Sequence, residues 1–447
     1  MVDFELPKSL GQMRGLISQL AIHKLRPVAR EWDEKEHEVP WPIVNEVHKM
    51  MKAMGASALG GTGVRAKGAS KGGKEGNGES KGESMGTLSG AILAEALTYG
   101  DAGLALCMPG PQLGGAAIMA AGTPAQKEKW LSRFPGEKPT WGAMSITEPG
   151  SGSDTASIRT TARKEGNRWI LNGEKIFVTS GQLALEKSDG LVVVWARVLP
   201  PGVKAIEQVE GHAAMRAFIV PAGTRGIKVA KVEKKLGIRA SNTVSLVLED
   251  CAIPLENLLG EPILDTHGSA SQPSGASLRD APASKEAKGF KGVMATFDST
   301  RPIVASFAIG VAQAALDFTK EMLKKQGIQL RYGLSPARVS AAEQDVMKME
   351  AELQAARLLA WRASWMMDRK QPNALEAAMA KGKAGTAATN ACLKCSEICG
   401  WFGYSRKHLL EKWIRDVKIN DIYEGTGQIQ LLIMARRVLG YTREQLK

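Results

Sequence analysis

The sequence predicts an α+β protein in which a middle β-domain follows one helical domain and precedes another. Residues 1–140 and 291–447 contain runs with apolar residues at three- and four-residue spacing, which is the period of an amphipathic helix. Residues 141–260 instead alternate apolar and polar side chains between turn residues, as in the run GLVVVWARV. This change of period predicts an N-terminal α-helical domain, a small antiparallel β-barrel or sandwich, and a C-terminal helical domain.

The N-terminal domain is expected to contain several helices and one long basic loop. Helical spacing runs from Leu10 and resumes at Trp41, after a Pro-containing breaker. Residues 62–86 are rich in Gly, Lys, Ser and Glu with almost nothing to bury, so a flexible loop is expected. Gly68–Lys74 has the outline of a phosphate-binding loop, but Glu75 stands where Ser or Thr should hold magnesium, which argues against that function.

Residues 141–181 contain two separate motifs. TEPGSGSD, Thr147–Asp154, combines Gly and Ser so that backbone N–H groups and hydroxyls can converge on a phosphate or a polar cofactor edge. RWILNGEKIFVTSG consists of two alternating runs joined by Asn172–Gly173, a pair that favours a type I′ hairpin turn. By themselves these features describe an ordinary loop and hairpin at the rim of a β-domain.

The C-terminal domain is expected to follow a flexible insertion, residues 261–290, which is rich in Ser, Ala and Pro and lacks periodicity. Residues 301–325 predict one helix, and Ser340 with Glu343 predicts a capping box that opens the next. The cysteines in CLKCSEIC invite a metal or redox site. Their spacing instead places all three on one helical face without a fourth ligand, so core packing is expected and no metal site is predicted.

Composition restricts the protein class more than its function. A chain of 447 residues suggests two or three domains, and 44% hydrophobic with 23% charged residues is ordinary for a soluble globular protein. No apolar run approaches the ~18 residues of a membrane span, and the first residues lack the features of a signal or transit peptide, so a cytoplasmic location is expected. The net charge of +13 suits polyanionic ligands, an anionic membrane or nucleic acid, and does not choose among them.

Three motifs resemble the acyl-CoA dehydrogenase family. TEPGSGSD is similar to its cofactor-loop signature, NGEKIFVTSG to its flavin-packing strand, and DIYEGTGQIQ, Asp421–Gln430, to the segment that carries its catalytic base. The resemblance extends over most of the chain. It implies FAD as cofactor and the acyl-CoA dehydrogenase fold, in which the C-terminal domain is a four-helix bundle.

The resemblance makes Glu424 the catalytic base, whereas in isolation it would be a solvated turn residue. A base is needed because the α-hydrogen of an acyl thioester is a weak acid, and a carboxylate enclosed with an apolar chain has a raised pKa. In the family the thioester oxygen is held by the N–H of this Glu and a flavin ribityl hydroxyl. The β-hydrogen leaves as hydride to the flavin, which gives a trans-2-enoyl-CoA.

Further residues are assigned by the same resemblance. Ile146 and Thr147 face the flavin ring, Phe177 takes the place of an aromatic residue that packs on it, and Thr179 approaches its N5 region. The remaining cofactor positions are Ser153, Thr426 and Gln428. The positions assigned to the substrate are Ser153, Asp298, Arg301 and Gly425; without the resemblance, Arg301 would be a surface arginine at a helix N-terminus.

The chain departs from the family where FAD adenosine crosses a dimer interface. Gln329 stands where relatives have an Arg, and Arg331 is shifted by two residues, which along a helix points it elsewhere. Glu397 replaces a Gln, and Trp401 replaces the second Gly of a Gly-Gly pair. Arg331 and Glu397 are still counted as cofactor-binding candidates.

The expected partners are an acyl-CoA substrate, an electron-transfer flavoprotein and further copies of the chain in a homodimer or homotetramer. One alternative is the same fold acting as an enoyl-CoA reductase or acyl-CoA oxidase, which the motifs do not separate from a dehydrogenase. Another is a non-catalytic member that binds nucleic acid or a membrane surface through its excess charge. An intact Glu424 argues against that last alternative. Nucleic acid is therefore not an expected partner, and contact with a membrane surface is not favoured.

Overall fold

The computed structural model describes residues 6–53, 85–203, 205–209, 214–261, 288–442 and 445. These residues form two compact units. The first unit is Met1–Gly110, Lys234–Asn242 and Phe297–Lys447, and the second is Pro111–Glu233 and Thr243–Thr296. This division differs from the three sequence ranges predicted above, because the N-terminal and C-terminal helices pack into one unit and residues 111–140 belong with the sheet.

The first unit is helical. Its N-terminal helices are α1 (Lys8–Leu20), α2 (Ala29–Glu34), α3 (Trp41–Ala53), α4 (Gly86–Gly100) and α5 (Ala102–Leu106), with a π-helical turn at Ala21–Leu25 and a 3₁₀ turn at Arg26–Val28. Its C-terminal helices are α10 (Lys288–Lys325), which begins in the second unit, α11 (Ala341–Asp368), α12 (Ala374–Cys399), α13 (Trp401–Tyr404), α14 (Leu410–Val417) and α15 (Gly427–Leu439). The predicted basic loop, residues 62–86, lies outside the described residues except for its last two.

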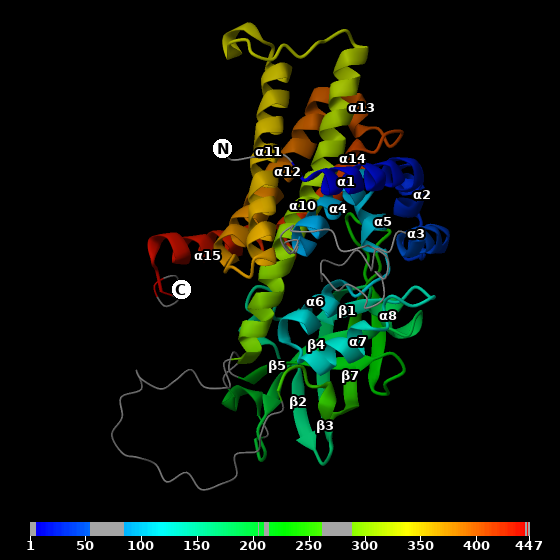
Figure 1. Ribbon diagram of the computed structural model, residues 1–447, viewed down its shortest axis with the longest axis vertical. Coiled ribbons are helices and arrows are strands. Elements are labelled where there is room, and N and C mark those ends of the chain that lie inside the picture. Colours follow the sequence, from blue (N-terminus) through cyan, green and yellow to red (C-terminus); the bar gives the residue numbers. More distant parts are fainter. Residues whose placement is uncertain are drawn as a thin grey trace, which may run out of the picture. The chain divides into compact units, whose positions relative to one another are not determined.

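The core of this unit lies among long helices that run side by side (Figure 1). One buried apolar cluster joins Leu316 of α10, Val346 and Leu353 of α11, and Trp413 of α14. Cys392, Cys395 and Cys399 belong to the same cluster, which confirms core packing, and burial raises the pKa of the Cys395 thiol to about 12. Contrary to the expectation that no segment approaches a membrane span, Gly292–Lys325 is long and apolar enough to cross a membrane. However, 72% of its most apolar window is buried, as in a core helix.

Local signals for helix ends agree with the structure in several places. The predicted capping box is present: Glu343 N–H donates to Ser340 Oγ (3.3 Å), and Ser340 N–H donates to Glu343 Oε2 (2.7 Å). The predicted helix 301–325 is also present, within the longer α10. Because α10 begins at Lys288, the last residues of the range 261–290 are helical and the predicted insertion ends earlier; residues 262–287 lie outside the description.

The second unit is built on one seven-stranded sheet with helices α6 (Gln112–Ala121), α7 (Pro124–Leu131) and α8 (Gly181–Glu186). Its strands are β1 (Gly142–Ser145), β2 (Thr161–Glu165), β3 (Arg168–Thr179), β4 (Leu191–Leu199), β5 (Met215–Pro221), β6 (Ile227–Val232) and β7 (Thr243–Pro254). The path is β1-β4-β2-β3-β7-β6, with β5 paired to β4. The expectation of a purely antiparallel sheet was wrong, since β1 and β2 both pair in parallel with β4.

The predicted Asn172–Gly173 hairpin was also wrong. The hairpin joins β2 and β3 and turns at Gly166–Asn167, whereas Asn172 and Gly173 lie inside the continuous strand β3. A Cβ on Gly173 would come within 2.5 Å of Thr160 Oγ1, so glycine permits close packing there. The Asn172 side chain exchanges hydrogen bonds with Asp250 of β7, and the register shifts beside it, as in a β-bulge.

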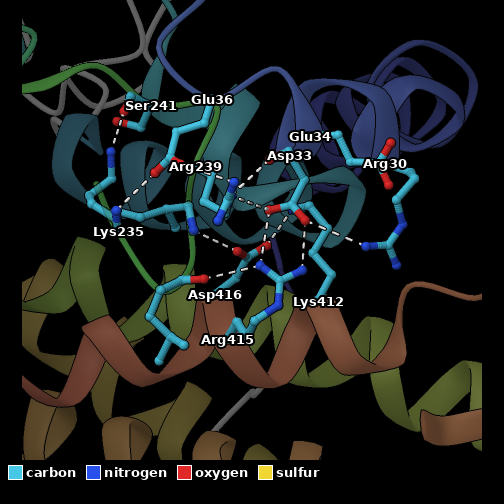
Figure 2. Close-up of polar contacts among 12 residues, drawn as sticks. Arg30, Asp33, Glu34, Glu36, Lys235, Arg239, Ser241, Lys412, Arg415 and Asp416 are labelled. Atoms are coloured by element: carbon cyan, nitrogen blue, oxygen red, sulfur yellow. Dashed lines mark hydrogen bonds and ion pairs between the residues drawn. The ribbon is translucent and has the colours of Figure 1, made fainter. Parts of the chain in front are cut away.

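A buried ion cluster joins three distant segments of the first unit (Figure 2). Lys412 of α14 contacts the carboxylates of Asp101 and Asp416, and all three side chains are at most 1% exposed. Asp416 Oδ1 accepts a hydrogen bond from Ile238 N–H (2.6 Å), and Arg415 pairs with Asp33 of α2 (2.6 Å). The cluster therefore ties Lys234–Asn242, the connection between β6 and β7, to both terminal parts of the chain.

Candidate functional site

Glu424 lies in a tight turn between a 3₁₀ turn, Lys418–Asp421, and helix α15. Its φ is +55°, and that of Gly425 is +90°. A positive φ is costly for a residue with a Cβ, so contacts in the folded protein must hold Glu424 in this conformation. Thr426 then caps α15, because its hydroxyl accepts a hydrogen bond from Ile429 N–H.

The carboxylate of Glu424 is held by α10. Thr300 Oγ1 donates a 2.5 Å hydrogen bond to Glu424 Oε2. Arg301 donates from Nε to the carbonyl of Glu424 (3.5 Å) and from Nη1 to Asp298 Oδ1 (2.8 Å). The structure thus brings Asp298, Arg301, Glu424 and Gly425 together, as the sequence predicted.

Burial raises the pKa of Glu424 above its ordinary value, while the Thr300 hydrogen bond and the charges of Arg301 and Lys381 oppose this rise. Burial likewise raises the pKa of Asp298, opposed by Arg301, and the buried Arg301 is 3% exposed. A carboxylate with a raised pKa and a fixed side chain is suited to removing a proton from a carbon acid.

Four of the predicted cofactor residues come together at one end of the sheet in the second unit. Ile146 and Thr147 follow β1, and Phe177 and Thr179 end β3. Ile176 N–H donates to Thr147 O (2.9 Å), and Lys175 Nζ donates to Ile146 O (3.1 Å), so the two segments are joined directly.

Phe177 has an unusual setting within this group. Its φ is +56° and its side chain is 61% exposed, although most aromatic residues of this sheet are buried. Ser180, three residues later, has a φ of +58°, and its buried Oγ has no hydrogen-bond partner in the part of the chain that the structure describes. An exposed ring and an unpaired buried hydroxyl are features of a surface that receives a ligand.

Glu148 and Lys175 form a buried ion pair beneath this surface. Lys175 Nζ lies 2.7 Å from Glu148 Oε1, and the same carboxylate accepts from Thr160 N–H (3.0 Å) and from Arg159 N–H. Burial alone would raise the pKa of Glu148, but the Lys175 charge and these donors hold it below its ordinary value. Burial lowers the pKa of Lys175 to about 8.

Of the remaining candidates, Thr426 lies next to Gly425 in the Glu424 turn, whereas the others have different surroundings among the described residues. Ser153 and Gln428 are exposed, and Glu397 pairs with Lys394 (2.5 Å). Arg331 is bound by Glu343, with Nε at 2.9 Å from Oε1 and Nη2 at 2.8 Å from Oε2. The assumption that Arg331 continues a helix was wrong, because α10 ends at Lys325. The cofactor roles of Arg331, Glu397, Thr426 and Gln428 stay predictions.

Comparisons with known proteins assign the chain to a family. Residues 9–135 match the acyl-CoA dehydrogenase N-terminal domain, 143–251 its middle domain and 287–439 its C-terminal domain. The chain belongs to the acyl-CoA dehydrogenase family. It is an oxidoreductase that acts on acyl-CoA, and its fold of helical, β-sheet and helical domains confirms the predicted class.

Individual relatives match nearly the whole length of this chain. The rat mitochondrial short-chain specific acyl-CoA dehydrogenase is 33% identical over 439 residues, which cover 97% of this chain and 91% of the relative. The structure of butyryl-CoA dehydrogenase from Megasphaera elsdenii is 29% identical with a TM-score of 0.75, covering 98% and 100% of the two chains. A chain from the structure of the electron transferring flavoprotein of Acidaminococcus fermentans is 28% identical with the same TM-score and coverage.

Sequence reasoning missed four residues of these groups. Thr300 directly precedes Arg301 but was not singled out, and Ser180 stands inside the motif NGEKIFVTSG. Lys381 could have been noticed, because it interrupts a helical face of small apolar residues that includes Ala377, Ala384 and Ala388. Gln430, fully buried on α15, is the last residue of the motif DIYEGTGQIQ but was given no role.

Replacing Lys175 with Met is expected to destabilise the protein strongly. The substitution leaves the Glu148 carboxylate buried without its ammonium partner, which typically costs ~3–5 kcal/mol. The measurement is the denaturation midpoint of Lys175→Met, compared with that of Lys228→Met. The control removes a lysine from an exposed pair with Glu249 on the same sheet, and its midpoint is expected to stay close to that of the wild type. Equal midpoints for the two variants would contradict a structural role for the buried pair.

Proposed function

We propose that this protein is an FAD-dependent enzyme that converts a short-chain acyl-CoA into the trans-2-enoyl-CoA. The observation that carries the proposal is the setting of Glu424: a partly buried carboxylate with a raised pKa, fixed by Thr300 in a strained turn. Structural carboxylates can have raised pKa values too, but strain and burial at one position are characteristic of a functional residue.

The residues of the second unit fit a flavin. Phe177 offers an exposed ring for stacking, Ser180 an unpaired buried hydroxyl, and Ile146 and Thr147 a backbone edge fixed by Lys175 and Ile176. These residues, with Thr179, would hold FAD. FAD, when bound, accepts a hydride from the β-carbon of the substrate.

Glu424 would take the α-proton while the α-C–H bond breaks. The electron pair released at the α-carbon forms the double bond as the β-hydrogen leaves with its own electron pair, so atoms and charges balance. Thr300 holds Oε2 and thereby directs the other oxygen of the carboxylate towards the substrate. Arg301 and Asp298 restrain the backbone of the same turn.

The proposed substrate class is supported by the relatives. The mammalian relatives at 32–36% identity are named short-chain specific acyl-CoA dehydrogenases, and the Megasphaera elsdenii enzyme is a butyryl-CoA dehydrogenase. We therefore propose a four-carbon acyl chain as the preferred substrate. The likeness to a chain in the Acidaminococcus fermentans electron transferring flavoprotein structure supports such a flavoprotein as the electron acceptor.

An anaerobic titration of the purified holoprotein tests this proposal. Butyryl-CoA is expected to bleach the flavin absorbance at once, and palmitoyl-CoA far more slowly. Added electron-transfer flavoprotein should restore the absorbance. Flavin that no saturated acyl-CoA bleaches, but that crotonyl-CoA reoxidises after chemical reduction, would support the enoyl-CoA reductase alternative, and fast reoxidation by oxygen would support an oxidase. A preparation that cannot bind FAD would overturn the proposal.

A further inference from the structure

Lys381 of α12 lies buried beneath the turn that carries Glu424. Its side chain is 1% exposed, and its Nζ donates a hydrogen bond to the carbonyl of Gly425. Gln430 Nε2 donates to the same carbonyl (2.9 Å) and to that of Glu424 (3.4 Å). Two buried donors therefore hold the inner carbonyls of this strained turn.

The turn packs closely against α12 near Lys381 because Gly382 and Gly385 have no side chains there. A Cβ on Gly385 would lie 3.1 Å from Asp421 Cα, and one on Gly382 would lie 3.3 Å from Gln430 Cβ. Larger side chains at these positions would push the segment 420–430 away from the helix. The buried lysine is thus enclosed by the turn on one side and by its own helix on the other.

We propose that Lys381 is a positioning residue for the catalytic base: its ammonium holds the Glu424–Gly425 turn in its strained conformation and places a buried positive charge beside the Glu424 carboxylate. This inference rests on the proposed function above. It assigns a role to a residue that would touch neither substrate nor flavin.

The charges around Glu424 support this assignment. From α10, Thr300 donates to the carboxylate, and Arg301 adds a positive charge that Asp298 partly compensates. Tyr423 is adjacent in the chain, and burial raises its pKa, so it stays neutral. Lys381 is the second cation that lowers the pKa of Glu424 against the effect of burial.

The protonation state of Lys381 itself depends on the same neighbours. Burial lowers its pKa to about 8, while Asp421 and Glu424 raise it and Arg301 lowers it. Below that pH the ammonium is charged and favours the ionised base. Removing the charge of Lys381 must therefore raise the pKa of Glu424. The ionised carboxylate loses a stabilising cation, whereas the protonated carboxyl group was not stabilised by that cation.

The test compares Lys381→Met with Lys383→Met. Lys383 lies on the same helix, but it is only half-buried and pairs with Glu352, so its replacement removes an equal charge that does not contact the turn. Both variants are purified with FAD, and the rate of flavin reduction by butyryl-CoA is measured by stopped flow across pH. Hydrogen–deuterium exchange of residues 421–430 provides a readout that does not depend on the flavin.

We expect Lys381→Met to reduce the rate by about 10–100-fold, to raise the apparent pKa of the rate by about one unit, and to speed exchange across the turn. Lys383→Met is expected to match the wild type in all three. If Lys381→Met does not fold, Lys381→Gln, which keeps a donor without the charge, should show the same pKa change with a smaller rate loss.

Two results would overturn the inference. One is a rate profile and exchange pattern of Lys381→Met that match those of the wild type. The other is an equal change in Lys383→Met, which would indicate a general charge effect. A wild-type protein whose flavin no acyl-CoA reduces would instead show that the proposed function is wrong, and the role of Lys381 would fall with it.

Discussion

Replacing Glu424 with Gln is expected to abolish reduction of the bound flavin by acyl-CoA while acyl-CoA still binds. The amide has nearly the shape of the carboxylate and can still accept the hydrogen bond from Thr300, so the turn should persist. It cannot take a proton from carbon. Because general base catalysis contributes ~10²–10⁴-fold, we expect a rate loss near the upper end of that range.

The pH dependence of flavin reduction in the wild type gives a second test of Glu424 as the base. Only ionised Glu424 can accept the α-proton, so the rate of flavin reduction should rise with pH through the pKa of this carboxyl. Burial raises that pKa, which places the rise above the pH at which an exposed glutamate ionises. This limb should be missing from the residual activity of Glu424→Gln.

The matched control is Glu352→Gln on α11, where a half-buried carboxylate pairs with Lys383. Its rate and pH profile should equal those of the wild type. Stopped-flow flavin reduction and equilibrium binding of butyryl-CoA separate chemistry from affinity. Retention of most of the rate in Glu424→Gln would show that another group removes the proton, and the proposed mechanism would be wrong.

Replacing Lys412 with Met is expected to be the most destabilising single change. It leaves Asp101 and Asp416, both 0% exposed, facing each other without the ammonium that lies between them. Removing one partner of a buried ion group typically costs ~3–5 kcal/mol. Asp101 also caps α5, and Asp416 accepts a hydrogen bond from Ile238 N–H, so the start of α5 and the middle of the Lys234–Asn242 segment should both loosen.

Urea unfolding followed by circular dichroism measures this change. Lys24→Met, which removes a lysine from an exposed pair with Glu46 in the same unit, is the control and should have little effect. Adding Asp416→Asn to Lys412→Met should recover part of the loss, because one buried charge is then removed. A midpoint for Lys412→Met equal to that of the control would contradict the role of this cluster.

Local sequence patterns predicted those elements that are specified by residues close together in the chain. The period of the apolar residues predicted the helical and β ranges, and Ser340 with Glu343 predicted the start of α11, because both halves of a capping box lie within one turn. The three motifs were sufficient to indicate the family and, with it, Glu424, Arg301 and Asp298 as neighbours.

Local patterns were wrong where packing overrides a turn preference. Asn172–Gly173 has the composition of a hairpin turn, yet Thr160 packs against Gly173 and Asp250 binds Asn172, so the chain continues as one strand. The predicted end of α10 at Lys325 was correct, but the expectation that Arg331 lies on a helix was wrong. Gly327, with a φ of +79°, follows α10 as a C-terminal cap, so the helix does not continue to Arg331.

The sequence by itself determined the order of helical and β segments, because that order depends on short-range periodicity. Its motifs, whose residues are adjacent in the chain, indicated the family and so led to Glu424 as the proposed base. Only the tertiary structure showed Thr300, Lys381 and Gln430 around Glu424, and Lys412 between two aspartates. These contacts join residues up to 311 positions apart. Burial gives them their effect on pKa and stability, and burial is a property of the packed fold.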